Sequence, residues 1–215
     1  SPNHQEPLAC HGDYMIEALA AHYAFAQPWL ARQDLRKSAW IYKNINYRNF
    51  HTSFSLAWLQ MLMDYHDFTG DKALIGELAP YVHELLDTYT SWRGKNGLIS
   101  DAPNYMFMDW VKINGIECHH PPAVIGQGYL TAFYYNGLAM ASRVAELTGD
   151  TARVAKYAKL RQQVAEAFNR ELWNPEKGLY RDGKPFQSSV KPHKYLPADT
   201  QIETFSPHAT FLAGL

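Results

Sequence analysis

Residues 123–172 read AVIGQGYLTAFYYNGLAMASRVAELTGDTARVAKYAKLRQQVAEAFNREL, and this stretch decides the fold. Its first half, 123–147, is nearly uncharged all round, whereas its second half, 151–172, places apolar residues at a spacing of three or four among charged ones. A helix that is apolar on every side must be covered on every side, and an amphipathic helix buries one stripe. The stretch therefore predicts a hairpin of a buried inner helix and a half-solvated outer helix.

The connection between the two halves, Thr148-Gly149-Asp150, also occurs as Thr69-Gly70-Asp71. Glycine suits the left-handed position that ends one helix, and aspartate can cap the N-terminus of the next. Each copy therefore predicts a helix–helix joint with almost no loop. The earlier helices follow the same alternation, with nearly uncharged segments at 14–26 and 53–68 and amphipathic segments at 29–45 and 72–92.

A second pair of matches lies at nearly the same interval. Trp92 recurs as Trp173, and Gly97-Leu-Ile-Ser-Asp101 recurs as Gly178-Leu-Tyr-Arg-Asp182, each about 80 residues later. Ordered matches at one interval indicate a repeated supersecondary unit, although generic helical hairpins remain an alternative. No alternating pattern predicts a central sheet. We therefore expect an all-α fold, an inner ring of helices wrapped by an outer ring.

The amino-acid composition excludes several classes of function for this protein. The 215 residues carry 20 Lys and Arg against 21 Asp and Glu, which excludes the basic footprint of a nucleic-acid binder. Two cysteines cannot build a four-cysteine zinc site. The uncharged run 118–142 is interrupted by Pro121 and Pro122, so a buried helix explains it better than a membrane span. Nucleotide-binding, serine-hydrolase and zinc-protease motifs are absent, and we expect no cofactor.

Acids and aromatics carry the remaining chemistry. Asp109 and Trp110 place a carboxylate beside an indole in the long segment 93–121, and loops of this length are usually functional or disordered. Glu6 and Asp13 flank the start of the first helix, where Glu6 can equally be a surface acid and Asp13 an N-cap. Carboxylates bind hydroxyls and transfer protons while flat rings stack on sugars, so the expected ligand is a carbohydrate.

Three further residues are possible contacts of that ligand. His119 can bind a hydroxyl, and the pair His119-His120 has no third residue at a metal-ligand spacing, so we expect no metal. Phe54 begins an inner helix, where core packing is the default role. His11 is either a ligand contact or a local loop residue.

Four stretches resemble the catalytic domain of bacterial alpha-L-rhamnosidases, within the six-hairpin glycosidases. Glu6-Pro-Leu-Ala-Cys-His-Gly-Asp13 resembles the family's Glu-Arg-x-Gly-Trp-Thr-Gly-Asp, and Asp109-Trp110 resembles its Asp-Trp pair. Residues 54–71 and 206–215 resemble inner helices. The resemblance implies a partial (α/α)6 barrel, about six to seven helices of twelve, forming one domain over 1–215 that is truncated at both ends.

The resemblance also implies roles. Glu6 is expected to be the general acid of an inverting glycosidase, Asp13 to bind the sugar hydroxyls, and Trp110 to line the sugar pocket. The general base is expected beyond Leu215. The family's Arg, Trp and Thr are here Pro7, Cys10 and His11, but the spacing from the Glu to the Asp is preserved.

Two rival functions stay open. One is a non-catalytic helical-repeat module that binds a glycan or a protein, which predicts that no second carboxylate faces Glu6. The other is a different barrel glycosidase of the trehalase-like or uronyl-hydrolase-like kind, because a fold does not fix the sugar.

Overall fold

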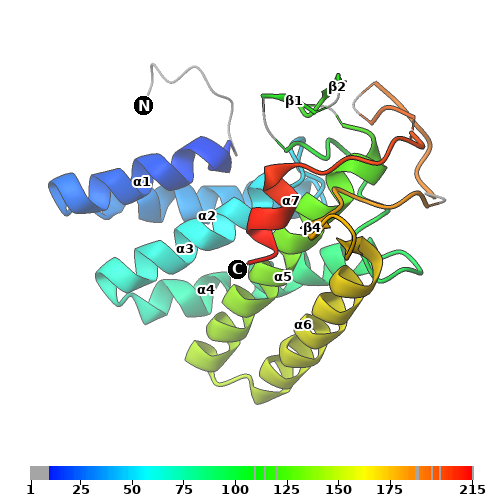
Figure 1. Ribbon diagram of the computed structural model, residues 1–215. Helices are drawn as coiled ribbons and strands as arrows, with labels where there is room; N and C mark the ends of the chain where they lie inside the picture. The colour runs from blue at the N-terminus through cyan, green and yellow to red at the C-terminus, as the bar shows by residue number, and fades with distance from the viewer. Residues whose placement is uncertain are drawn as a thin grey trace.

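The structure, a computed structural model, describes residues 10–108, 110–113, 115–119, 121–186, 189–194, 196–198 and 200–214. In these residues the chain forms three long antiparallel helix pairs and one further short helix, without a central sheet. Figure 1 shows the three pairs side by side, with the short helix lying against the third. The helices are α1 (His11–Phe25), α2 (Trp29–Asn44), α3 (Phe54–Thr69), α4 (Lys72–Ser91), α5 (Ala123–Thr148), α6 (Thr151–Leu172) and α7 (Pro207–Leu212).

The joints between helices confirm the expected capping. Gly70 ends α3 at φ 67° and Gly149 ends α5 at φ 76°, both in the left-handed region. The Asp71 carboxylate accepts a hydrogen bond from the Leu74 N–H at 3.0 Å, and the Asp150 carboxylate accepts one from the Arg153 N–H at 3.0 Å. Each Gly-Asp step therefore ends one helix and starts the next.

The inner and outer helices differ as their sequences predict. Trp58 of α3 and Tyr134 of α5 are fully buried, and α5 packs against α3, α4 and α6. The indole N–H of Trp58 donates to the Leu35 carbonyl of α2 at 3.1 Å, which fixes the side chain in the core. The amphipathic α6 instead buries one stripe, which includes Tyr157 and Val164.

Helix α1 departs from the expectation for an inner helix. Only His11 and His22 of α1 are buried, and its Ile16 and Tyr23 are 58% and 77% exposed. The helix packs on α3, and its other side faces solvent in the described part of the chain. An apolar sequence predicted burial on all sides, but burial also needs a neighbour on each side.

The second pair of sequence matches forms two similar turns. After α6, β3 (Trp173–Asn174) pairs antiparallel with β4 (Leu179–Tyr180), and the turn contains Gly178 at φ 65°. After α4, Arg93 and Ile99 form an antiparallel bridge around Gly97 at φ 86°. A third small hairpin, β1 (Lys112–Ile113) with β2 (Ile116–Glu117), lies in the long segment before α5.

Two boundaries differ from the sequence expectation. Helix α1 starts at His11, three residues before the predicted start, and α7 starts at Pro207 rather than directly after Thr200. Ser206, which precedes α7, is extended at φ −94° and ψ 159°. None of the described helices combines the length and apolarity needed to cross a bilayer.

Candidate carbohydrate site

Aromatic rings gather where α3 and α5 begin. We call this group the aromatic cluster. His51 stacks on Phe107 with ring centroids 4.7 Å apart and meets Phe54 edge-on at 4.6 Å. The cluster joins the segment before α3 to the long segment before α5. Its members are Phe50, His51, Phe54, Tyr105, Phe107, Trp110 and His119.

Backbone pairing holds the two segments together. The Thr52 N–H donates to the Tyr105 carbonyl at 3.1 Å, and His51 and Tyr105 form a parallel bridge. The Asn104 side-chain amide donates to the carbonyls of Arg48 and Asn49 at 2.9 and 3.1 Å. Because these bonds tie the backbone before α3 to segment 104–105, the rings project from a fixed frame rather than from independent loops.

Trp110 and His119 form the outer part of the cluster. Their rings are stacked, with centroids 3.7 Å apart and planes 20° apart, and Trp110 is 73% exposed. The β1–β2 hairpin brings them together, since the Cys118 N–H donates to the Val111 carbonyl at 2.9 Å and the Met108 N–H to the Cys118 carbonyl at 3.0 Å. The pair therefore presents a flat surface whose outer ring is open to solvent.

Burial favours the neutral form of His119. Burial lowers the pKa of His119, and the nearby Glu117 carboxylate opposes that shift only in part. The imidazole is therefore uncharged at neutral pH. A neutral imidazole can both donate and accept a hydrogen bond, which matches a sugar hydroxyl.

The first turn of α1 reaches this cluster. A Cβ added to Gly12 would lie 2.7 Å from the Phe54 ring, so the helix start packs directly on that ring. Asp13 is exposed on the same turn. It is not the N-cap, which is Cys10, so the capping alternative for Asp13 is wrong. As an acid in the first turn it instead complements the helix dipole and stays accessible.

The other predicted site residues are placed as follows. Glu6, Asp109 and His120 lie outside the described residues. Phe54 is half-buried in the cluster. His11 is fully buried, with its Nδ1 2.6 Å from the Tyr42 hydroxyl and its Nε2 3.3 Å from the Asp34 carboxylate, so both ring nitrogens tie α1 to α2.

The structure adds His51, Tyr105 and Phe107 to the residues that the sequence had singled out for the site. Segment 93–121 was expected to be functional, but the pairing of 51–52 with 105 has no sequence signature. The run of aromatic residues at 105–110 was the only available signal. Among the described residues, no group of three His, Cys, Asp or Glu side chains is placed to hold a metal ion.

Comparison with known protein families identifies the family of this chain. The model of the bacterial alpha-L-rhamnosidase six-hairpin glycosidase domain matches residues 6–204. The chain belongs to this family. The match begins at Glu6 and extends past the β3–β4 turn, so it includes the three predicted acids Glu6, Asp13 and Asp109 and the aromatic cluster of this rhamnosidase-family domain.

Solved structures agree with the fold of the rhamnosidase-family domain. A family GH78 rhamnosidase of Bacillus sp. GL1 superposes with a TM-score of 0.70 at 20% identity, covering 80% of this chain and 18% of that one. A Klebsiella oxytoca rhamnosidase with rhamnose bound gives 0.62 at 20% identity, covering 80% and 34%. The chain thus spans about a fifth to a third of these relatives. A search of curated proteins gave no significant match.

Proposed function

We propose that this chain forms part of the active site of an inverting, alpha-L-rhamnosidase-like glycoside hydrolase, with Glu6 as its general acid. The family match supports glycoside hydrolysis, and the solved relatives are rhamnosidases, one of which has rhamnose bound. Rhamnose is therefore the first sugar to test. In this proposal the general base lies outside residues 1–215.

The observation that carries the proposal is the open Trp110 ring stacked on His119, in an aromatic cluster whose Phe54 ring packs on the first turn of α1. A sugar presents an apolar face and a rim of hydroxyls. The indole can cover that face. His119 can donate to and accept from the hydroxyls of the rim, and the Asp13 carboxylate can accept from them. Glu6 precedes Asp13 by seven residues in the sequence, as the general acid does in the family motif that this stretch resembles.

Inversion requires two carboxyl groups about 6.5–9.5 Å apart, so that a water fits between the sugar and the base. The acid must stay protonated near the working pH, which partial burial of its carboxyl group favours. Replacing Glu6 with Gln keeps the shape of the side chain and removes the transferable proton.

Leaving-group dependence tests the role of Glu6. In the intact protein, Glu6→Gln should slow hydrolysis of an alkyl rhamnoside by about 10²–10⁴-fold. It should slow hydrolysis of a dinitrophenyl rhamnoside far less, because that leaving group departs without protonation. Glu176→Gln, which changes an exposed glutamate in the β3–β4 turn, is the matched control. Equal losses on both substrates would contradict the acid role.

Sugar stacking has its own test. Trp110→Ala should raise KM for an aryl rhamnoside by about tenfold, since a ring contact is worth about 0.5–1.5 kcal/mol beyond buried area. Trp40 of α2 is 63% exposed and lies outside the cluster, so Trp40→Ala is the control. An unchanged KM for Trp110→Ala would remove the indole from the sugar site.

A further inference from the structure

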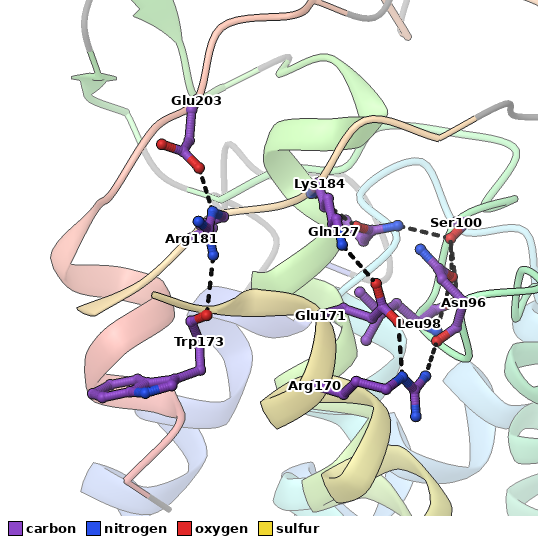
Figure 2. Close-up of polar contacts among 10 residues, drawn as sticks. All are labelled: Asn96, Leu98, Ser100, Gln127, Arg170, Glu171, Trp173, Arg181, Lys184 and Glu203. Carbon is purple, nitrogen blue, oxygen red and sulfur yellow. Dashed lines mark hydrogen bonds and ion pairs between the residues drawn. The ribbon is translucent and has the colours of Figure 1, made fainter. Parts of the chain in front are cut away.

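A cavity of about 370 Å³ opens where the end of α6 meets the β3–β4 hairpin and the extended segment before α7. We call it the basic pocket. Its volume lies within the range of small-ligand sites. Figure 2 shows its polar side chains drawn together from these three elements. The lining residues used below are Arg170, Glu171, Trp173, Arg181, Lys184 and Glu203.

Two ion-pair groups fix the walls of the basic pocket. Glu171 accepts from Arg170 Nε at 2.8 Å and from Lys184 Nζ at 3.2 Å. On the other side, Arg181 Nε pairs with the Glu203 carboxylate, and a second guanidinium nitrogen of Arg181 donates to the Trp173 carbonyl at 3.0 Å. Three cations face two carboxylates, so the described lining keeps one net positive charge.

The cations retain unused donors. A guanidinium has five N–H groups, and Arg170 uses one on Glu171 and one on the Asn96 carbonyl at 3.0 Å. Arg181 likewise uses two. The side chains of Arg170 and Lys184 are 59% and 54% exposed, so a ligand can reach them. The glutamate oxygens also keep lone pairs that can accept hydrogen bonds.

The backbone beneath these side chains is fixed on α5. The Lys184 N–H donates to the side-chain carbonyl of Gln127, a fully buried residue, at 3.3 Å. Next to it, a Cβ on Gly183 would lie 1.5 Å from the Val124 carbonyl oxygen, so the chain runs directly against the first turn of α5. A site on such a frame loses little conformational freedom when a ligand binds.

We propose that the basic pocket binds an acidic sugar unit, a hexuronic acid residue of a glycan. A uronate carboxylate offsets the single uncompensated positive charge, and the sugar hydroxyls both donate to the glutamates and accept from the guanidinium groups. An inorganic anion has no hydroxyl array to pair with Glu171 and Glu203, and a neutral sugar leaves the extra charge unpaired.

The pocket lies at the same end of the bundle as the aromatic cluster, because α6 runs antiparallel to α5 and the Gly128 N–H donates to the Asp182 carbonyl at 2.7 Å. It is nevertheless built from different residues. The inference does not depend on the proposed glycosidase activity, since binding to the basic pocket is measured directly.

Calorimetric titration of the intact protein tests this inference with three probes: digalacturonate, the neutral disaccharide galactobiose and sodium phosphate. Digalacturonate should bind about tenfold or more tightly than galactobiose, because a hydrogen-bonded carboxylate is lost in the neutral sugar. Its affinity should fall as salt is raised. Phosphate that binds as tightly as digalacturonate, or equal affinities for the two disaccharides, would overturn the proposal.

Variants locate the binding to this pocket. Lys184→Gln, which removes a half-exposed charge, should weaken digalacturonate binding about three- to fivefold. Lys177→Gln is the matched control, since Lys177 lies in the nearby β3–β4 turn with its ammonium 5.0 Å from the Phe205 ring and outside the pocket lining. Equal affinity for Lys184→Gln and the wild-type protein, with circular dichroism unchanged, would place the binding elsewhere.

Discussion

The turn that follows α4 and the turn that follows α6 share a sequence but differ in what they hold. Both contain a left-handed glycine, Gly97 or Gly178, and both end in an aspartate. The next residue is Ala102 in the first turn and Gly183 in the second. The second turn runs so close to α5 that no side chain fits. The repeated sequence thus specifies the conformation of the turn. The residue that follows it, Ala102 or Gly183, instead depends on how closely the chain then approaches a neighbouring helix.

The two aspartates also differ. Asp182 is fully buried and accepts from both the N–H and the hydroxyl of Ser206, directly before α7. Asp101 is half-buried and accepts from the Ser189 N–H at 3.0 Å. The second turn therefore anchors the start of a helix, whereas the first anchors an extended segment.

The largest effect is expected at the close approach. Gly183→Ala should destabilise the protein by about 3 kcal/mol or more, because the added methyl group overlaps the Val124 carbonyl and forces the backbone apart. The free energy of unfolding from denaturant titration measures this. The converse change, Ala102→Gly, should cost only about 1 kcal/mol. Similar costs for both would remove the difference between the turns.

Replacing the two turn aspartates should cause the next largest losses in the free energy of unfolding. Asp182→Ala should cost about 2–3 kcal/mol, because the Ser206 N–H and hydroxyl lose a charged acceptor in the interior. Asp101→Ala, which removes the acceptor of the Ser189 N–H at a half-buried position, should cost about 1 kcal/mol. Chemical denaturation of the two variants side by side makes the comparison. A larger loss for Asp101→Ala would mean that the first turn is the more important anchor.

Replacing the helix-capping aspartates, Asp71 and Asp150, should cause smaller losses of stability. Asp71→Ala should cost about 1–2 kcal/mol and Asp150→Ala about 1 kcal/mol. Asp71 accepts from the Tyr65 hydroxyl and from Arg32, both at 3.1 Å, in addition to the Leu74 N–H, whereas Asp150 has only Arg153 as a partner in the described chain. Thermal unfolding at neutral pH compares the two, and equal costs would show that the extra partners of Asp71 contribute nothing.

The effect of Asp71 should also depend on pH. The Leu74 N–H, with help from Arg32 and Tyr65, holds the pKa of the Asp71 carboxyl below its ordinary value. A carboxyl group whose pKa is lower in the folded state stabilises the protein at every pH above its unfolded-state pKa, which is about 3.9 for aspartate. This stabilisation is lost as the pH falls from there through the folded-state pKa. The cost of Asp71→Ala should therefore shrink below about pH 4. A constant cost down to pH 2 would contradict the assignment.

The smallest effects are expected at the turn glycines. Gly178→Ala should cost about 1 kcal/mol, since alanine is strained at positive φ and the position is open. Gly97→Ala should cost somewhat more, because its Cβ would also lie 2.8 Å from Cβ of Ala167 in α6. The difference in melting temperature between the two variants isolates that contact. Identical melting temperatures would show that α6 yields to the extra methyl group.

Much of this fold follows from the sequence. The helix pairs, the Gly-Asp joints and the repeated turns each depend on neighbours within one supersecondary unit, where periodicity and capping act directly. The exposure of one side of α1 could not be predicted in this way, because apolar residues such as Ile16 and Tyr23 are expected to be buried in an inner helix. Whether such residues are buried depends on which elements lie beside them.

The candidate site was only partly predictable for a related reason. Trp110 stood out because it is an indole next to an acid in a long loop. His51 and Phe107 meet through the main-chain pairing at Thr52 and Tyr105, and backbone hydrogen bonds leave no residue pattern. His11 shows the opposite case: it falls within a stretch matching the family's acid motif, yet its ring serves the contact between α1 and α2.

The base and the tip of the β1–β2 hairpin differ in how tightly they are packed. Its base fixes the Trp110–His119 pair, while a Cβ at Gly115 in its tip would meet no atom within 4 Å. Exposed loop tips of this kind tolerate insertion and exchange. The tip can therefore change in length or charge while the ring pair stays in place. If the pair binds sugar as proposed, a change in the tip would alter the surroundings of the ligand without remodelling the helical scaffold.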